Sequence, residues 1–195
     1  MDIDPYIRNL MEKAVKGDAV AQYKLGMEYE QGDKIKRDIV KTVKLVLLSA
    51  QQGYLKAQIH VAGLYESGSG VKQDHKKAFF WYVKAAGQGS TFAQCKLGMI
   101  YIEGRGVEKD QMKGFEWVRA SAESGDILAQ KELGILYAQG IGTAIDLSRA
   151  YAWFSMAYEK GDDSVLEIRG LYSSMMTQKQ LELAESIKQE LSQQH

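Results

Sequence analysis

The sequence predicts an all-α protein made of stacked antiparallel helix pairs, on two observations. First, the dipeptide Ala-Gln recurs at a constant step of 36 residues, and a tyrosine, glycines and an aspartate keep the same step. The four dipeptides begin at Ala21, Ala57, Ala93 and Ala129. Second, each copy contains two stretches with helical spacing of apolar residues, joined by glycine-containing turns. A fixed period of this length indicates supersecondary units that stack into a solenoid.

We expect one repeat domain over residues 1–195. The four copies cover residues 21–56, 57–92, 93–128 and 129–164, without insertion or deletion. Residues 1–20 are expected to form an N-terminal capping helix, because "LMEKAVKGD" resembles the end of a second helix. Residues 165–195 are expected to form C-terminal capping helices, with Thr177 and Gln180 as a capping box.

Each copy carries signals for the ends of its helices. The second helices are preceded by aspartates that can cap free amides, namely Asp38, Asp74, Asp110 and Asp146. They are followed by glycines suited to a left-handed turn, namely Gly53, Gly89, Gly125 and Gly161. The next first helix can be capped by Asp18, Ser90, Asp126 or Asp162, whereas Tyr54 leaves one copy without this cap.

Small residues recur inside the first helices, at Gly26, Ala62, Gly98 and Gly134. Glycine in a helix costs roughly 0.5–1 kcal/mol relative to alanine, so its recurrence predicts close approach of another backbone. Tryptophans are expected to fill the core between layers, at Trp81, Trp117 and Trp153; Leu45 replaces tryptophan in the first copy. The Gly-x-Gly of "EGRGVEKD" in the third copy recurs between the helices of the second and fourth copies and lacks a Walker-type ending, so we interpret it as a turn.

Composition excludes several classes of protein. Lys plus Arg equals Asp plus Glu at 25 each, so no net charge favours nucleic acid or an anionic membrane. No apolar run approaches the roughly 20 residues that span a bilayer, and the N-terminal stretch is acidic where a secretory signal would be basic. Cys95 is the single cysteine and cannot form an internal disulfide. We therefore expect a cytoplasmic protein that does not insert into membranes.

Catalytic and metal-binding patterns are absent from the sequence. The histidines are His60, His75 and His195, and with Cys95 they form no zinc pattern. We expect no cofactor, no metal and no enzymatic activity. The alternative from another class is an enzyme with an unrecognised site around His60 and Glu66.

The repeated residues closely resemble the Sel1-like repeat family, which is related to the tetratricopeptide repeats. The resemblance is carried by "AQCKLGMIYIEGRGVEKD" in the third copy and "GVKQDHKKAFFWYVKAAGQG" in the second, and it extends from residue 21 to about residue 161. It implies a right-handed α-solenoid whose first helices line a concave surface. It also implies a non-enzymatic module that binds a protein partner.

Positions of the first helices that vary between copies are the candidate partner surface. Together with Phe80, a lone aromatic on a second helix, the candidates are Tyr23, Met27, Ile59, His60, Glu66, Cys95, Met99, Ile102, Lys131 and Ile135. The apolar members would form a nearly continuous strip that accepts a peptide or helix. The alternative is that some of them pack against the adjacent first helix.

Two protein-binding roles are implied by the resemblance. One is a bacterial immunity protein that neutralises a toxin or effector by occluding it, and the other is a signalling or secretion adaptor. A self-assembling structural unit is a third alternative. The residues themselves name no partner.

Overall fold

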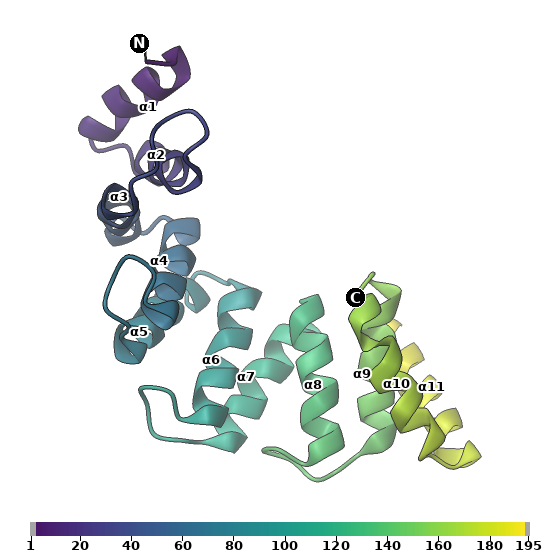
Figure 1. Ribbon diagram of the computed structural model, residues 1–195. Helices are drawn as coiled ribbons and strands as arrows, with labels where there is room; N and C mark the ends of the chain where they lie inside the picture. Colours follow the sequence, from purple (N-terminus) through teal and green to yellow (C-terminus); the bar gives the residue numbers. More distant parts are fainter. Residues whose placement is uncertain (1–2, 194–195) are drawn as a thin grey trace. The chain divides into compact units, whose positions relative to one another are not determined.

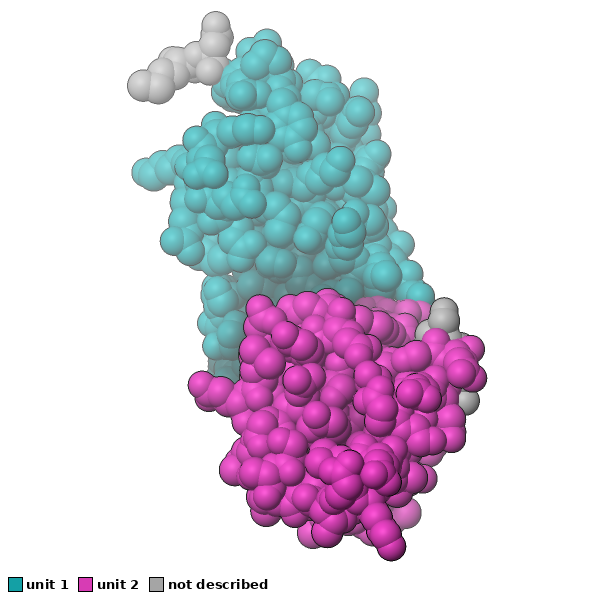
Figure 2. Space-filling model, turned by 90° about the vertical axis from the view of Figure 1, so that its right-hand side faces the viewer, with its two compact units in different colours: residues 1–88 teal, residues 89–195 magenta. Residues whose placement is uncertain are grey.

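The structure is a computed structural model that describes residues 3–193, and over this range it contains helices and no strands (Figure 1). The chain forms two compact units, residues 1–88 (unit 1) and 89–195 (unit 2), coloured separately in Figure 2. Each unit contains two helix pairs, as the 36-residue period predicts.

In its described part, from residue 3 on, unit 1 contains five helices: α1 (Pro5–Val15), α2 (Ala19–Gln31), α3 (Ile39–Gln51), α4 (Leu55–Ser67) and α5 (His75–Ala86). The pairs are α2 with α3 and α4 with α5, and α1 packs on α2 in the position of a preceding second helix. Ile7, Leu10 and Ala14 of α1 are buried against Leu25 and Tyr29 of α2.

Unit 2 begins with two further pairs, α6 (Thr91–Glu103) with α7 (Gln111–Glu123) and α8 (Ile127–Gln139) with α9 (Leu147–Glu159). A 3-10 turn (Asp163–Val165), α10 (Leu166–Ser174) and α11 (Gln178–Gln193) follow. α11 lies along α9: the Ser148 hydroxyl donates to the Gln180 carbonyl at 3.0 Å, and the Lys188 ammonium lies 2.8 Å from a carboxylate oxygen of Glu159.

The predicted helix ends are confirmed. Each second helix starts with an aspartate whose carboxylate accepts an amide hydrogen three residues later, at 2.9–3.0 Å. Tyr54 makes no side-chain capping bond, as expected, so α4 begins uncapped. Thr177 and Gln180 form the capping box of α11, since the Gln180 amide donates to the Thr177 hydroxyl at 3.3 Å and the Thr177 amide donates to the Gln180 side chain at 2.9 Å.

Another helix approaches closely at the glycines of the first helices, as predicted, but its backbone is the close neighbour only at Gly98; at Gly26 and Gly134 the close neighbour is a side chain. A Cβ built on Gly26 would lie 2.8 Å from Cγ2 of Val46, and one on Gly134 would lie 2.6 Å from the ring of Phe154. Both contacts join the two helices of one pair. Each glycine therefore admits a large side chain from the second helix where alanine would collide with it.

The expectation that tryptophans fill the core is correct for one of the three. Trp153 is buried in the core of unit 2, and it lines a small cavity together with Ile187 and Leu191 of α11. Trp81 and Trp117 are only half-buried. Trp153 differs because the C-terminal helix α11 lies beside it.

Candidate functional site

The variable positions of the first helices differ in burial between the two units. Tyr23, Met27, Ile59, His60 and Glu66 of unit 1 are all half-buried. In unit 2, Met99, Lys131 and Ile135 are half-buried as well, but Cys95 and Ile102 are 1% and 7% exposed. The prediction that these last two line an open strip is therefore wrong, because neither presents its side chain to solvent.

Cys95 packs in the hydrophobic core of unit 2. Burial raises the pKa of its thiol to about 12, and the negative charges of Asp126 and Glu132 act in the same direction. Asp126 and Glu132 belong to the N-cap and body of α8. The alternative that such residues pack against the adjacent first helix is the correct one for Cys95.

Ile102 is buried because it faces the second helix of its own pair. A Cβ built on Gly114 of α7 would lie 2.5 Å from Cγ1 of Ile102. Glu66 is the equivalent residue one repeat earlier, and its carboxylate accepts a hydrogen bond of 2.9 Å from the hydroxyl of Tyr82. Tyr82 is 2% exposed. Glu66 therefore supplies an acceptor for a buried hydroxyl, which gives it a structural role.

Side chains from α2 and α4 converge in unit 1 on a group that we call the α2–α4 cluster: Tyr23, Met27, Glu30, Tyr54 and His60. The Tyr23 ring meets the Tyr54 ring edge to face, with centroids 5.3 Å apart, and it meets the His60 ring at 6.3 Å. Nε2 of His60 lies 3.3 Å from a carboxylate oxygen of Glu30. Met27, Tyr23 and Tyr54 pack on the buried residues beneath. The cluster combines aromatic surface, a thioether and a contact between a histidine and a carboxylate.

The electrostatics of the cluster follow from its partial burial. The pKa of Tyr23 is raised, first by burial and then by the neighbouring Tyr54 and the negative charge of Glu30. The Tyr23 hydroxyl therefore keeps its proton at neutral pH and remains a hydrogen-bond donor. The side chains of His60 and Glu30 are 23% and 31% exposed, but Nε2 of His60 is itself buried and makes no hydrogen bond.

Tyr54 belongs to the α2–α4 cluster but was not among the partner-binding residues predicted from the sequence. The sequence signal for it was present, because tyrosine stands where the other copies place Asp or Ser as a helix cap. A lost cap costs roughly 0.5–2 kcal/mol, so a residue that fails to cap is expected to contribute elsewhere. Here the tyrosine ring packs against Tyr23 instead.

The remaining predicted partner-binding residues lie outside the α2–α4 cluster. Lys131 donates from its ammonium to the Ser164 hydroxyl at 3.2 Å, and Met99 and Ile135 pack partly against the core of unit 2. Phe80 lies on the second helix α5 and is 50% exposed, as anticipated for a solvent-facing aromatic. It stacks edge to face on Trp81 at 5.2 Å.

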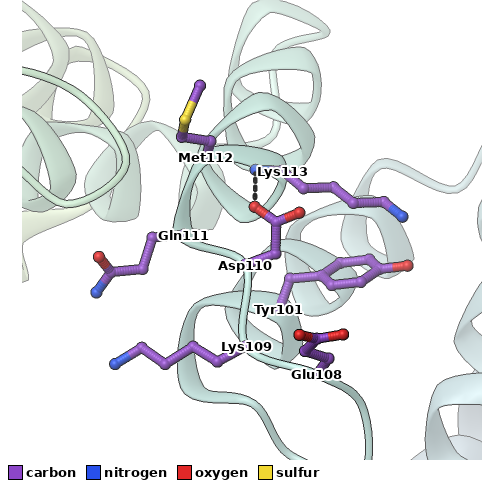
Figure 3. Close-up of a pocket in the computed structure, with 7 residues that line it drawn as sticks. All are labelled: Tyr101, Glu108, Lys109, Asp110, Gln111, Met112 and Lys113. Atoms are coloured by element: carbon purple, nitrogen blue, oxygen red, sulfur yellow. Dashed lines mark hydrogen bonds between the residues drawn. The ribbon is translucent and has the colours of Figure 1, made fainter.

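A pocket of about 730 Å³ lies at the start of α7 and includes the repeat-framework residues Tyr101 and Asp110 in its lining (Figure 3). Its lining is Tyr101 and the segment 108–113. The Asp110 carboxylate accepts from the amide of Lys113 at 2.9 Å and so occupies the free helix terminus that an anion would need. A smaller pocket with Tyr29, Asp38 and Lys41 repeats the arrangement in unit 1. The pocket is thus a consequence of the repeat.

Within residues 3–193, no three His, Cys, Asp or Glu side chains are grouped so that they could hold a metal ion. His60 and Glu66, the pair considered for an enzymatic site, have different partners, since His60 faces Glu30 and Glu66 accepts from Tyr82. His195 lies outside the described residues. No helix in the described part is long and apolar enough to cross a bilayer.

Comparison with known proteins gives a family match over most of the chain. The model of the Sel1 repeat matches residues 19–54, 55–90, 91–126 and 127–162. These units have the predicted length and begin two residues earlier than predicted, at the first residue of each first helix. No curated protein matches the chain.

Among solved structures, a protective antigen with an SLR fold from uropathogenic Escherichia coli is 36% identical, with a TM-score of 0.78. The match covers 82% of this chain and 34% of that one, so this chain spans about a third of its relative. A Sel1 repeat protein from Oxalobacter formigenes is 34% identical over 76% of this chain and 59% of that one, with a TM-score of 0.71. An immunity protein from Pseudomonas aeruginosa is 15% identical, covering 98% of this chain and 84% of that one; its TM-score of 0.53 shows a shared fold.

Proposed function

The chain belongs to the Sel1 repeat family, and from that premise we propose that it binds a protein partner through the α2–α4 cluster of unit 1. Sel1 repeat proteins are protein-interaction modules. The observation that carries the proposal is the convergence of Tyr23 and His60 at 6.3 Å, because it joins residues from two repeats at positions the framework leaves variable.

The chemistry of the cluster suits a protein interface. Tyrosine is enriched among the residues that dominate binding energy, and methionine adapts its shape to a partner. Tyr23 and Tyr54 are held by each other and by the core beneath them, so little side-chain entropy is lost when a partner covers them. The Glu30 carboxylate, whose side chain is 31% exposed, supplies a hydrogen-bond acceptor at the edge of this aromatic surface. The result is a preorganised patch that can be desolvated on binding.

The proposed partner binding could serve an immunity protein or an adaptor. The fold is shared with an immunity protein, which supports a role in which the chain occludes a toxic enzyme. A signalling or secretion adaptor uses the same binding chemistry without inhibiting its partner. The experiment below distinguishes the two once the partner is isolated.

Affinity capture tests the proposal. Wild-type chain, Tyr23→Arg and Lys56→Ala are immobilised, and extracts of the source cell are passed over all three. Lys56 is an exposed residue of α4 outside the cluster and serves as the control. We expect a protein that is retained by the wild type and by Lys56→Ala and is bound at least roughly tenfold more weakly by Tyr23→Arg, as for a central interface residue.

Circular dichroism and thermal melting establish that Tyr23→Arg is folded. Equal capture by folded Tyr23→Arg would contradict the assignment of the cluster. If the captured protein is a toxic enzyme whose activity survives saturating amounts of this chain, the immunity form is wrong and the adaptor form remains.

A further inference from the structure

Helix α10 of unit 2 has the register of a first helix, and the place of a second helix beside it is open. Gly170 follows Gly134 by 36 residues. A Cβ built on Gly134 would lie 2.6 Å from the ring of Phe154 on the second helix of its pair, whereas a Cβ built on Gly170 would meet nothing within 4 Å. Leu166, one turn before Gly170 on the same side of α10, is 42% exposed. α10 thus presents an uncovered side where the preceding first helices are packed.

The next helix along the chain, α11, does not fill this place. It packs along α9 through the contacts of Gln180 and Lys188 described above (Figure 1). In the register of a second helix, the residue of α11 that corresponds to Phe154 is Glu190, which is exposed. A glutamate there does not supply the large apolar side chain that the glycine of a first helix receives. α11 is therefore not the second helix of α10.

Arg169 of α10 occupies a position that is apolar and buried in the four repeats. Its equivalents are Leu25, Val61, Leu97 and Leu133. Leu25 shares a core cluster with Leu10 of α1, which lies where a preceding second helix would be, and Leu45 of its own second helix packs against that cluster. The same position in α10 therefore lies between α9 and the open second-helix place.

Two tyrosines of α9 hold the guanidinium of Arg169. Its Cζ lies 4.6 Å from the ring centroid of Tyr158 and 5.8 Å from that of Tyr151. Tyr158 also departs from the repeat, because its equivalents are the buried alanines Ala14, Ala50, Ala86 and Ala122. A tyrosine and an arginine thus replace an alanine and a leucine of the framework, and the two new side chains contact each other. Stacking orients the guanidinium and leaves its N–H groups available.

Arg169 has no carboxylate partner among residues 3–193, where its recorded contacts are the two tyrosine rings. The neighbouring acids are placed otherwise. Glu159 is paired with α11, and the Asp162 carboxylate accepts from the Ser164 amide at 3.0 Å. Glu167 lies two residues before Arg169, so it projects from the opposite side of α10. A guanidinium held in this way is suited to bind a carboxylate from another molecule.

The far end of the open place is acidic. In the third repeat, the Ser121 hydroxyl of the second helix donates to the carbonyl of Thr91, the first residue of the first helix, at 2.8 Å. The residue that corresponds to Thr91 before α10 is Asp163, which is exposed. A helix in the second-helix place would therefore meet a guanidinium at Arg169 and a carboxylate at Asp163.

We propose that α9 and α10 bind a helix of a partner protein in the place of a fifth second helix, and that an Asp or Glu of this helix pairs with Arg169. The next residue of the helix is large and apolar, so that it covers Gly170 as Phe154 covers Gly134. A Lys or Arg four residues after the acid meets Asp163. This spacing also lets the acid and the base stabilise the partner helix itself.

A second copy of the chain offers no helix with this pattern among its described residues. In the register of the second helices, the position opposite Arg169 holds Leu45, Trp81, Trp117 and Trp153, and α1 holds Asn9 there. None of these side chains carries the carboxylate that the guanidinium requires. The occupant is therefore a different protein.

A displayed helix library tests the proposal. The sequence of residues 110–126 is kept except at four randomised positions that face the first helix of their pair: Gly114, Trp117, Val118 and Ser121. The library is selected on the wild-type chain and on Arg169→Leu, which carries the apolar residue of the four repeats and should therefore fold. We expect Asp or Glu to be enriched at position 117 with the wild type, and apolar residues at that position with Arg169→Leu.

The affinities of the enriched helices give a second readout. Helices with an acid at position 117 should bind Arg169→Leu at least roughly tenfold more weakly than the wild type, because their carboxylate is left unpaired. Arg169→Lys should weaken binding several-fold, since an ammonium lacks the two-pronged geometry of the guanidinium. Arg8→Leu is the matched control, because Arg8 is an exposed residue of α1, and it should leave binding unchanged.

Three results would overturn the proposal. One is the absence of acidic residues at position 117 among helices selected on the wild type. Another is equal binding of acidic helices by Arg169→Leu that circular dichroism shows to be folded. The third is self-association of the wild type in sedimentation that Arg169→Leu abolishes, which would assign the place to a second copy. Tyr23→Arg should bind the selected helices as the wild type does, so failure of this surface and failure of the α2–α4 cluster are separately observable.

Discussion

Gly98 of α6 and Gly114 of α7 lie against each other's backbone. A Cβ built on Gly98 would be 2.7 Å from the Gly114 carbonyl oxygen, and a Cβ built on Gly114 would be 2.6 Å from the Gly98 carbonyl oxygen. Real Cβ atoms essentially never approach other heavy atoms this closely. In the third repeat, the two helices of one pair thus contact each other with a glycine on each helix. Neither backbone can move at this contact without shifting a whole helix.

Gly98→Ala should therefore destabilise the protein by about 1–3 kcal/mol, the usual cost of overpacking, despite the higher helix propensity of alanine. Gly63 is the matched control, because it lies inside α4 and a Cβ there meets nothing within 4 Å. Gly63→Ala should stabilise by about 0.5–1 kcal/mol. Urea unfolding measures both. The same sign for the two substitutions would contradict the close helix contact.

Acid should weaken the protein through Asp38 and Asp74. The pKa of each carboxyl is lowered from 3.8 in the folded state, first because the carboxylate accepts the amide hydrogen of Lys41 or Lys77. A lowered folded pKa contributes stability that is present above pH 3.8 and is lost as the pH falls through the folded pKa. Asp38→Asn/Asp74→Asn should show a shallower loss of stability below pH 3.8 than the wild type. Identical pH profiles of the urea midpoint would show that these carboxylates do not carry the effect.

Cys95 should be unreactive in the native protein. Its pKa of about 12 leaves almost no thiolate near neutral pH, and the side chain is 1% exposed. Labelling with a thiol reagent should be slow in buffer and fast in denaturant. Because the folded pKa lies above the ordinary 9.0, stability should fall as the pH rises from 9.0 toward 12, and Cys95→Ala should remove that component. Rapid native labelling would show that the thiol is open to solvent.

The tryptophans should differ in their contribution to stability. Trp153→Ala should cost about 3–5 kcal/mol, because this side chain is 3% exposed in the core of unit 2. Trp117→Ala should cost less, since Trp117 is only half-buried. Urea unfolding of the two variants makes the comparison. Equal losses would mean that burial does not set their contribution.

The helix pairs and their ends could be read directly from the repeated residues. Asp38 and Gly53 act through bonds and dihedral angles within a few residues, so their positions alone identify the boundaries of α3. Even the missing cap at Tyr54 could be predicted, because the residue at each position can be compared with the equivalent residues of the other repeats. The candidate site was less predictable, because the spacing of residues along one helix does not show which neighbouring helix covers them.

The amino-acid order sufficed for the period, the helix boundaries and the close-packed small positions, since these depend on local geometry repeated four times. The tertiary structure determined which individual side chains are buried and which are exposed. Ile102 is buried against Gly114 and Cys95 lies in the core, whereas Tyr23 and His60 meet at a half-exposed surface. The physical reason is that exposure depends on the side chains of the neighbouring helix, and those differ at equivalent positions of each repeat.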